Sequence, residues 1–162
     1  MMNLQEFFTG SWRLERRIIH HLSGEITGKA SGEVSFNNTE RNGSLFYFEQ
    51  GEIMYTPFDG KKFLFHRSFE YVIHENELSV YFKDGINNGQ LYQQYRLDET
   101  GLRLRAAGQH ECVLDHYTAE YAISNDNEFV LETVITGPHK AYTITTRYTR
   151  NDITAVRLEP EE

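Results

Sequence analysis

Hydrophobic and polar residues alternate along most of this chain. The stretch WRLERRIIHHL, residues 12–22, places every second side chain on one face, beginning with Trp12 and Leu14. A period of two is typical of a β-strand with one buried and one exposed face. After a return strand at 28–36, further runs of this kind follow: SLFYFEQGEIMY, KKFLFHRSFEYVI, ELSVYF, QLYQQYRL, LRLRAA, YTAEYAI, EFVLETVIT, AYTITTRYTR and ITAVRL. The pattern predicts about ten strands and almost no helix.

Short turn signals connect the predicted strands. SGE at 23–25, FDG at 58–60, DETG at 98–101, SNDN at 124–127 and GPHK at 137–140 are rich in the residues that tight turns favour. Strands joined by tight turns are antiparallel, and a meander of this length closes most economically into a barrel. We therefore predict an all-β, antiparallel up-and-down barrel of about 8–10 strands, which is just wide enough to hold one small ligand.

The opening NLQEFF is the exception to the alternation. Asn3 can cap a helix, and Leu4, Phe7 and Phe8 share one helical face. We expect a short N-terminal helix that covers one end of the barrel. The chain shows no linker, composition shift or internal repeat, so residues 1–162 are predicted to form a single domain.

Composition and charge exclude several classes of partner. The 162 residues are 39% hydrophobic and 14% aromatic, as in a globular β protein, and their formal charge is −8. Proteins that bind nucleic acids or anionic membranes usually carry clusters of lysine and arginine. The 16 lysine and arginine residues of this chain are dispersed, so we expect neither partner. Cys112 is the single cysteine and cannot form an internal disulfide. With no signal-peptide pattern and no long apolar stretch, the sequence predicts a cytoplasmic protein.

Two arginines lie within the alternating pattern. Arg16 shares the face of Trp12, and Arg67 lies among the phenylalanines of KKFLFHRSFEYVI. A buried arginine keeps its charge and needs an acceptor. Two arginines directed into one barrel could hold an anionic head group, while the aromatic residues accommodate an apolar body. The alternatives are an internal ion pair with a carboxylate such as Glu49, or a register that turns both arginines outwards.

The segment HECVLDHY, residues 110–117, contains several side chains that could bind a metal or take part in catalysis. His110, Cys112 and Asp115 suit zinc chemically, but the paired spacing of zinc sites is missing, and we predict no metal. Cys112 could act as a nucleophile with His110 or His116 as its base, although no signature of a thiol enzyme flanks it. The structural alternative is a strand and a turn, in which Asp115 begins the turn and Tyr117 opens the next strand.

Four separated motifs resemble those of a family catalogued as domain of unknown function 6314. HECVLDHY is similar to its H-x-C-x-x-D-x-Y motif, and FFTGSWRLERRI to its F-x-G-x-W-x-x-x-R stretch. FKDG at 82–85 resembles its F-x-D-G, and GPHKAY at 137–142 resembles its G-P-x-K-x-Y. His139 and Ala141 depart from the pattern, because the family carries a basic and an acidic residue there.

The resemblance implies a lipocalin-like, calycin-type barrel and no established activity. In such barrels the tryptophan of the first strand packs over one end near an arginine from a late strand. Here Trp12 with Arg147 or Arg150 is the candidate pair. The motif residues, together with Arg67 and the other positions discussed above, make up the candidate ligand-binding set: Arg16, Arg67, His110, Cys112, Asp115, Tyr117, Lys140 and Tyr142.

The leading functional hypothesis is a small-molecule binder that holds an anionic or polar-headed ligand in a cavity of about 300 Å³ or more. An isomerase, cyclase or hydrolase would instead use His110 as general base with Tyr117 and Lys140, and it requires the three side chains to converge. An inward histidine could also bind haem. A protein-interaction module would show a filled core and a large exposed apolar patch. The ligand, any cofactor and the oligomeric state are open, with a homodimer among the options.

Overall fold

The computed structural model describes residues 2–56, 60–107, 110–112, 115–138 and 140–151, apart from the side chains of 110–112 and 115. Within these ranges the chain forms one short helix, α1 (Leu4–Phe8), and the following strands: β1 (Gly10–His20), β2 (Ile26–Asn38), β3 (Ser44–Tyr55), β4 (Lys62–His74), β5 (Glu77–Phe82), β6 (Leu91–Leu97), β7 (Arg103–Ala106), β8 (His110–Cys112), β9 (Asp115–Asn125), β10 (Glu128–Thr136) and β11 (Ala141–Arg150).

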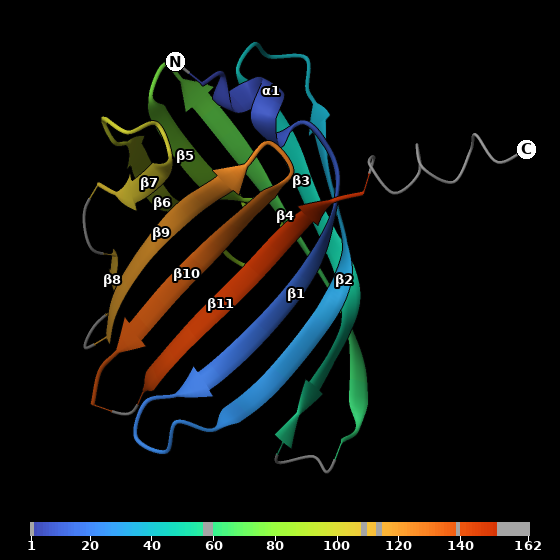
Figure 1. Cartoon of the computed structure of the whole chain (residues 1–162), viewed down its shortest axis with the longest axis vertical. Coiled ribbons are helices and arrows are strands. Elements are labelled where there is room, and N and C mark those ends of the chain that lie inside the picture. The colour runs from blue at the N-terminus through green and yellow to red at the C-terminus, as the bar shows by residue number, and fades with distance from the viewer. Residues whose placement is uncertain (1, 57–59, 108–109, 113–114, 139, 152–162) are drawn as a thin grey trace, which may run out of the picture.

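The strands close into an antiparallel barrel, which confirms the predicted fold class (Figure 1). The ring runs β9-β10-β11-β1-β2-β3-β4-β5-β6-β7, and β7 pairs back onto β9. The short strand β8 pairs with the first residues of β9, beside β7. HECVLDHY therefore contributes β8 and the first residues of β9. The second strand, expected to open at Tyr117, begins at Asp115, and the part of Asp115 in a turn stays a prediction because its side chain lies outside the described residues.

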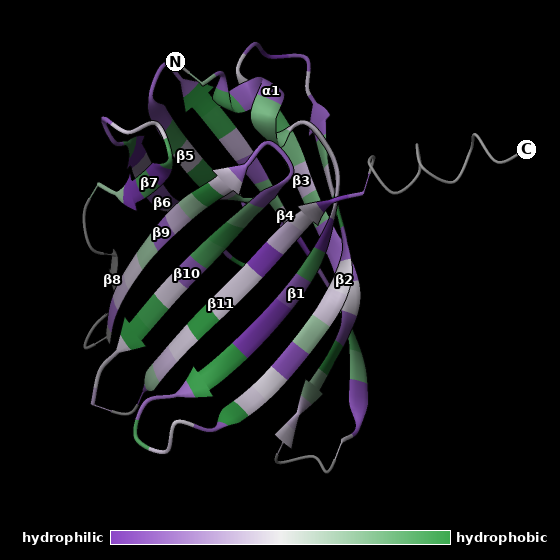
Figure 2. Cartoon of the chain, in the orientation of Figure 1, coloured by the Kyte–Doolittle hydropathy of each residue, from purple (hydrophilic) through white to green (hydrophobic). Residues whose placement is uncertain are grey.

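The period-two pattern becomes the inside and the outside of the barrel wall. Bands of hydrophobic and hydrophilic residues alternate along β10, β11, β1 and β2 in Figure 2. Trp12 and Leu14 of β1 are fully buried, whereas Ser11, Arg13 and Glu15, which alternate with them, are exposed. Directly paired residues of antiparallel strands share a face, so Leu14 lies beside Tyr148 of β11 and Gly32 of β2 on the inner face.

Helix α1 covers one end of the barrel, as its sequence predicts (Figure 1). The side chain of Asn3 caps the helix by accepting from the backbone N–H of Glu6 at 3.1 Å. Leu4, Phe7 and Phe8 are buried, and the Phe8 ring stacks on Phe36 of β2 with the ring centroids 5.2 Å apart. This end is consequently filled with aromatic side chains and closed.

Arg150 at the end of β11 joins β11 to helix α1 and to Trp12 at the closed end. Its guanidinium lies over the ring of Trp12, 4.1 Å from the centroid, and also donates to the carbonyl oxygens of Phe7 and Thr9. The Trp12 indole N–H donates in turn to the carbonyl oxygen of Phe8 at 2.8 Å. Arg150, rather than Arg147, is therefore the partner of the tryptophan that the family resemblance implies.

The opposite end of the barrel is open, and its wall is uneven. The hairpins β1–β2 and β3–β4 extend furthest from α1 (Figure 1). Strand β5 pairs with β4 only along Phe69–His74, so residues 62–67 of β4 extend beyond β5. The wall is therefore interrupted next to the first half of β4.

Two glycines allow β2 and β3 to approach each other closely just beyond Glu49. Gly32 and Gly51 are register partners. A Cβ on Gly51 would lie 2.0 Å from the carbonyl oxygen of Ser31, and one on Gly32 would lie 2.2 Å from that of Gln50. Only glycine fits at either position, because a side chain would collide with backbone.

Candidate functional site

A cavity of about 190 Å³ lies inside the barrel, between the aromatic core and the open end. Its wall contains Arg16, Glu49 and Arg67, together with aliphatic and threonine side chains of β10 and β11. It also contains six tyrosines: Tyr47, Tyr71, Tyr92, Tyr95, Tyr121 and Tyr148. The cavity is smaller than the roughly 300 Å³ expected from the sequence, because these tyrosine rings fill much of the barrel's width.

Two larger hollows lie on the outer wall. They measure about 340 and 750 Å³ and are more open to solvent than the interior cavity. The first is bordered by charged side chains such as Arg17 and Lys29, and the second lies beside Glu70. The interior cavity is the more enclosed space, and it brings Arg16 and Arg67 together.

Arg16 and Glu49 form a bidentate ion pair in the cavity wall. The two Nη atoms of Arg16 donate to the two carboxylate oxygens of Glu49 at 2.9 Å each, and Nε donates to Oγ1 of Thr146 at 2.8 Å. Glu49 is only 2% exposed and also accepts from the hydroxyl of Tyr47. The internal ion pair that the sequence offered as an alternative is confirmed.

Both Arg16 and Glu49 are charged. Burial by itself would raise the pKa of Glu49, but the hydrogen bonds and charge of Arg16 and the hydroxyl of Tyr47 outweigh burial and lower this pKa. Burial likewise disfavours the charged form of Arg16, yet Glu49 raises its pKa above the ordinary value. Since Glu49 already neutralises the charge of Arg16, the expectation that both arginines together hold an anionic head group stays a prediction.

The tyrosines form a hydrogen-bonded layer next to this ion pair. The hydroxyls of Tyr47 and Tyr148 lie 2.9 Å apart, and those of Tyr71 and Tyr121 lie 2.7 Å apart. Burial raises the pKa of all four, that of Tyr148 to about 12. The phenols are therefore neutral at physiological pH and can both donate and accept hydrogen bonds.

Arg67 is the more accessible cation of the cavity wall. Its side chain is 46% exposed, and its guanidinium lies over the rings of Phe69 and Phe82, 5.0 and 5.9 Å from their centroids. Its ion pair with Asp84 is long, at 3.5 Å between Nε and Oδ2. Asp84 is itself held by the backbone N–H of Ser68 at 2.8 Å. Arg67 is thus the more accessible of the two guanidinium groups, whereas all three nitrogens of Arg16 already donate to Glu49 or Thr146.

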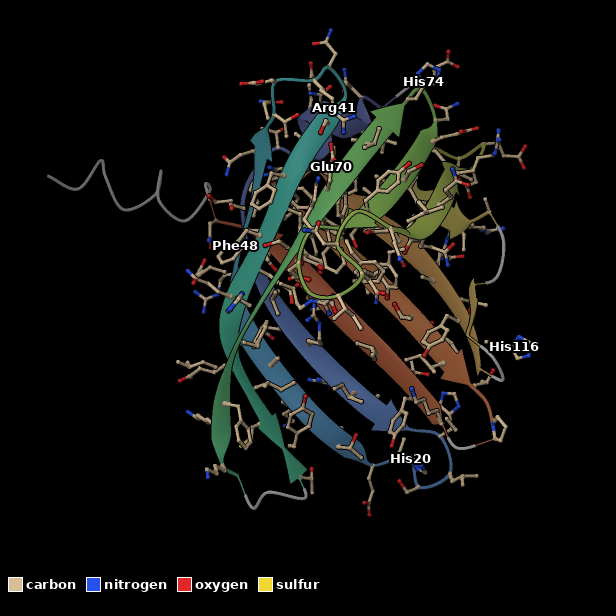
Figure 3. The ribbon with its side chains drawn as sticks, turned by 180° about the vertical axis from the view of Figure 1, so that it is seen from behind. His20, Arg41, Phe48, Glu70, His74 and His116 are labelled. Atoms are coloured by element: carbon tan, nitrogen blue, oxygen red, sulfur yellow. The ribbon has the colours of Figure 1, made fainter. Side chains whose placement is uncertain are left out.

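Tyr117 and Tyr142 lie nearer the open end than the arginines. Each is the register partner of Ile135 in β10, which lines the cavity, so all three residues face inwards. Tyr142 also faces His20 of β1, with the rings 5.2 Å apart. His116 precedes Tyr117 and points away from the barrel (Figure 3). Tyr117, Tyr142 and His20 therefore form part of the rim of the open end.

The other sequence candidates are Lys140, His110, Cys112 and Asp115. Lys140 is exposed beyond the start of β11. The side chains of His110, Cys112 and Asp115 lie outside the described part of the chain, and only their backbone pairing is known: His110 faces Tyr117, and Cys112 faces Asp115. The convergence that the enzyme hypothesis requires therefore stays a prediction, and so does haem binding.

Two further observations concern metals and membranes. Among the residues whose positions are described, no three histidine, cysteine, aspartate or glutamate side chains gather as a metal site would need. Within the same residues, no helix has the length and apolar character needed to cross a membrane.

Sequence reasoning underestimated the tyrosine layer and missed Thr146. The high frequency of tyrosine on the predicted strands was a visible signal, but it did not indicate which hydroxyls would meet. Thr146 reaches Arg16 because β1 and β11 are register partners at these two residues. They lie 130 residues apart in the sequence, and no local pattern marks the threonine as a partner.

The fold and the interior cavity define a lipocalin-like barrel. Solved structures with the same fold include an S-type phycobiliprotein lyase from Guillardia theta, with a TM-score of 0.63, 12% identity and 93% of both chains covered. A protein of unknown function of the DUF3598 family from Nostoc punctiforme matches with a TM-score of 0.58 and 9% identity, over 92% of this chain and 48% of the other. Rv2717c from M. tuberculosis gives 0.50 and 13%, over 91% and 95%.

The chain belongs to the family of unknown function DUF6314, whose model matches residues 8–150. This confirms the family resemblance of the four sequence motifs. A search of curated protein sequences finds no match. The identities to the solved structures are low, so those likenesses concern the fold alone.

Proposed function

We propose that this protein binds a small molecule inside the barrel, with a compact polar or anionic head group at Arg67 and a flat apolar body against the aromatic wall. The observation that carries the proposal is the enclosed cavity with one accessible guanidinium at its wall. Ligand sites of this kind combine an apolar lining with a few convergent polar groups.

The charges of the cavity favour a head group that is neutral or negative. Glu49 is already neutralised by Arg16, and the neighbouring tyrosines are uncharged. Among the described residues, the ion pair of Arg67 is with Asp84 at 3.5 Å, so a carboxylate could take better-aligned hydrogen bonds from the other N–H groups of Arg67. The stack with Phe69 and Phe82 already orients the guanidinium plane.

The size of the cavity limits what can be fully enclosed. About 190 Å³ corresponds to roughly six water molecules of liquid volume. A ring with a head group fits this space, and a longer ligand would extend past Tyr142 and Tyr117 into the open end. The ligand class proposed here rests on the cavity's own chemistry.

Three probes of equal size and different charge test the proposal. Benzoate, benzamide and benzylammonium would be titrated into isotope-labelled protein, with binding followed by amide chemical shifts. Benzoate should bind most tightly, because its negative charge is opposite to that of Arg67, and benzylammonium should bind least tightly, because it is a cation. Binding of none of the three, or equal binding of all, would remove the basis of the proposal.

A matched pair of variants locates the binding. Arg67→Gln should weaken benzoate about three- to tenfold and abolish the preference over benzamide, a range discounted because Arg67 is half exposed. Arg105→Gln is the control, since Arg105 is 62% exposed and its ion pair with Glu120 lies outside the cavity. Native mass spectrometry of protein purified without denaturation would in addition reveal the mass of any natural ligand that co-purifies.

A further inference from the structure

The first half of β4 has an unpaired edge. Strand β3 pairs with residues 62–72 of β4, but β5 pairs only with Phe69–His74. In the described part of the chain, no strand pairs with the other side of residues 62–67. Figure 3 shows this part of β4 beside β3, with no strand drawn along its opposite edge. An unpaired strand edge is a ready template for another extended segment.

The hydrogen-bond pattern identifies which residues present main-chain groups to the gap. The carbonyl oxygen of Ser68 accepts from the N–H of Lys83 on the β5 side, whereas the N–H of Ile73 donates to Gly43 on the β3 side. Even-numbered residues of β4 therefore point their main-chain groups towards the β5 side, and no register shift interrupts the strand. Leu64 and His66 consequently present their N–H and C=O groups to the gap.

The side chains along this edge are apolar and basic. Leu64 is 85% exposed on the outer face, and Phe63 is 37% exposed on the inner face. The sequence KKFLFH, residues 61–66, carries two lysines, one histidine and no acidic side chain, in a protein whose formal net charge of −8 counts histidine as neutral. Lys62 has Glu52 as a distant partner, at 4.0 Å.

We propose that the edge of β4 at residues 62–66 binds an extended acidic peptide segment of a partner protein as an added strand. Main-chain hydrogen bonds to Leu64 and His66 would hold the segment, as in other β-augmentation complexes. Residues of the added strand that face inwards would contact Phe63 and Phe65, and are expected to be apolar. Those that face outwards would lie beside Lys62, and are expected to be acidic. This site is separate from the proposed ligand head group at Arg67.

The charge distribution favours such a segment over a second copy of this chain. Edge-to-edge pairing of two copies would place the basic residues of both β4 strands next to each other. It would also bring together two barrels that each carry a formal charge of −8. A single extended segment with acidic residues avoids the first cost, because it places carboxylates beside the basic side chains of β4.

Two synthetic peptides test the proposal with the intact protein. One alternates valine and glutamate over eight residues, and the other alternates valine and lysine, so that both have the same β propensity and opposite charge. Fluorescence anisotropy of the labelled peptides gives the affinity, and hydrogen exchange reports protection of the Leu64 and His66 amides. The valine–glutamate peptide should bind and protect these amides, and the valine–lysine peptide should not.

The variant Leu64→Pro separates edge binding from other binding. It removes the N–H that points into the gap and leaves the ladder with β3 intact, since proline is tolerated where its nitrogen faces outwards from an edge. Affinity for the valine–glutamate peptide should fall about tenfold or more, while the circular dichroism spectrum stays unchanged. Leu64→Thr keeps the N–H and is the matched control, expected to lose no more than about threefold from the smaller apolar contact.

Each outcome has a defined meaning. Equal binding to wild type and Leu64→Pro, or equal binding of both peptides, would overturn the proposal, as would no binding at millimolar peptide. Self-association of the protein that Leu64→Pro abolishes would show that a second copy occupies the edge instead. Benzoate binding is measured in parallel and should be unaffected by Leu64→Pro, so failure of this proposal is distinguishable from failure of the proposed function.

Discussion

Removing one partner of the Arg16–Glu49 ion pair should destabilise the protein far more than removing both. Glu49→Gln leaves the guanidinium of Arg16 without a counter-charge, while Arg16→Met leaves the carboxylate buried and unpaired. The double variant has no uncompensated charge at the site. The perturbation is thus a double-mutant cycle on one buried pair.

The structure sets the size of the effect. The side chains of Arg16 and Glu49 are 20% and 3% exposed, and both Nη–carboxylate distances are 2.9 Å. Breaking a buried pair of this kind by removing one partner costs about 3–5 kcal/mol, and we expect the lower end because Arg16 is not fully buried. A loss of about 3 kcal/mol would lower the melting temperature of a chain of this length by roughly 6–12 °C. The double variant should recover about 2 kcal/mol or more of the summed losses.

Urea unfolding followed by circular dichroism measures the four free energies of the cycle. The Arg96–Glu77 pair is the matched control: its distance is 2.7 Å, but its side chains are 68% and 49% exposed. Its coupling energy should be below about 1 kcal/mol. The reasoning is refuted if the losses at Arg16 and Glu49 are additive, or if their coupling is no larger than that of the surface pair.

Three further measurements follow from the structure. Burial raises the pKa of Tyr148 to about 12, so the neutral Tyr148 phenol contributes its full stabilisation below about pH 10, and this stabilisation is lost as the pH rises towards 12. In an ultraviolet titration, the buried tyrosines should therefore stay un-ionised until the protein unfolds. The pKa of Glu49 is lowered from 4.5, so its pairing with Arg16 stabilises the fold above about pH 4.5 and is lost as pH falls below it, and Glu49→Gln should flatten this acid limb in urea unfolding. Gly51→Ala would bring a Cβ to 2.0 Å from the carbonyl oxygen of Ser31 and should cost about 1–3 kcal/mol, whereas Ser31→Ala, which keeps that oxygen, should cost less than about 1 kcal/mol.

Much of the fold could be predicted from the alternation of residues. The inward face that begins at Trp12 and Leu14 is confirmed, as are the helix that covers one end and the closure of the meander. These predictions succeeded because strand faces and turn residues are local properties of the chain. The family motifs also indicated that Trp12 would meet an arginine of the last strand, and Arg150 is that residue.

The roles of the two inward arginines could not be separated from the sequence. Both lie on hydrophobic faces, and either could have paired with Glu49. In the structure Glu49 forms its bidentate ion pair with Arg16, at 2.9 Å, although Arg67 is the direct register partner of Glu49 on β4. Arg67 is left with a long contact to Asp84 and with access to the cavity.

The sequence by itself determined the strands, the faces they bury and the family. The tertiary structure decided which end is closed, how much of the interior stays empty, which arginine stays accessible and where the wall is interrupted. The physical reason is that strand pairing around a closed ring joins residues that are distant in sequence, such as Arg16 with Thr146. A hydrophobic pattern states only that a face is buried, whereas the register of the neighbouring strands sets which groups it meets.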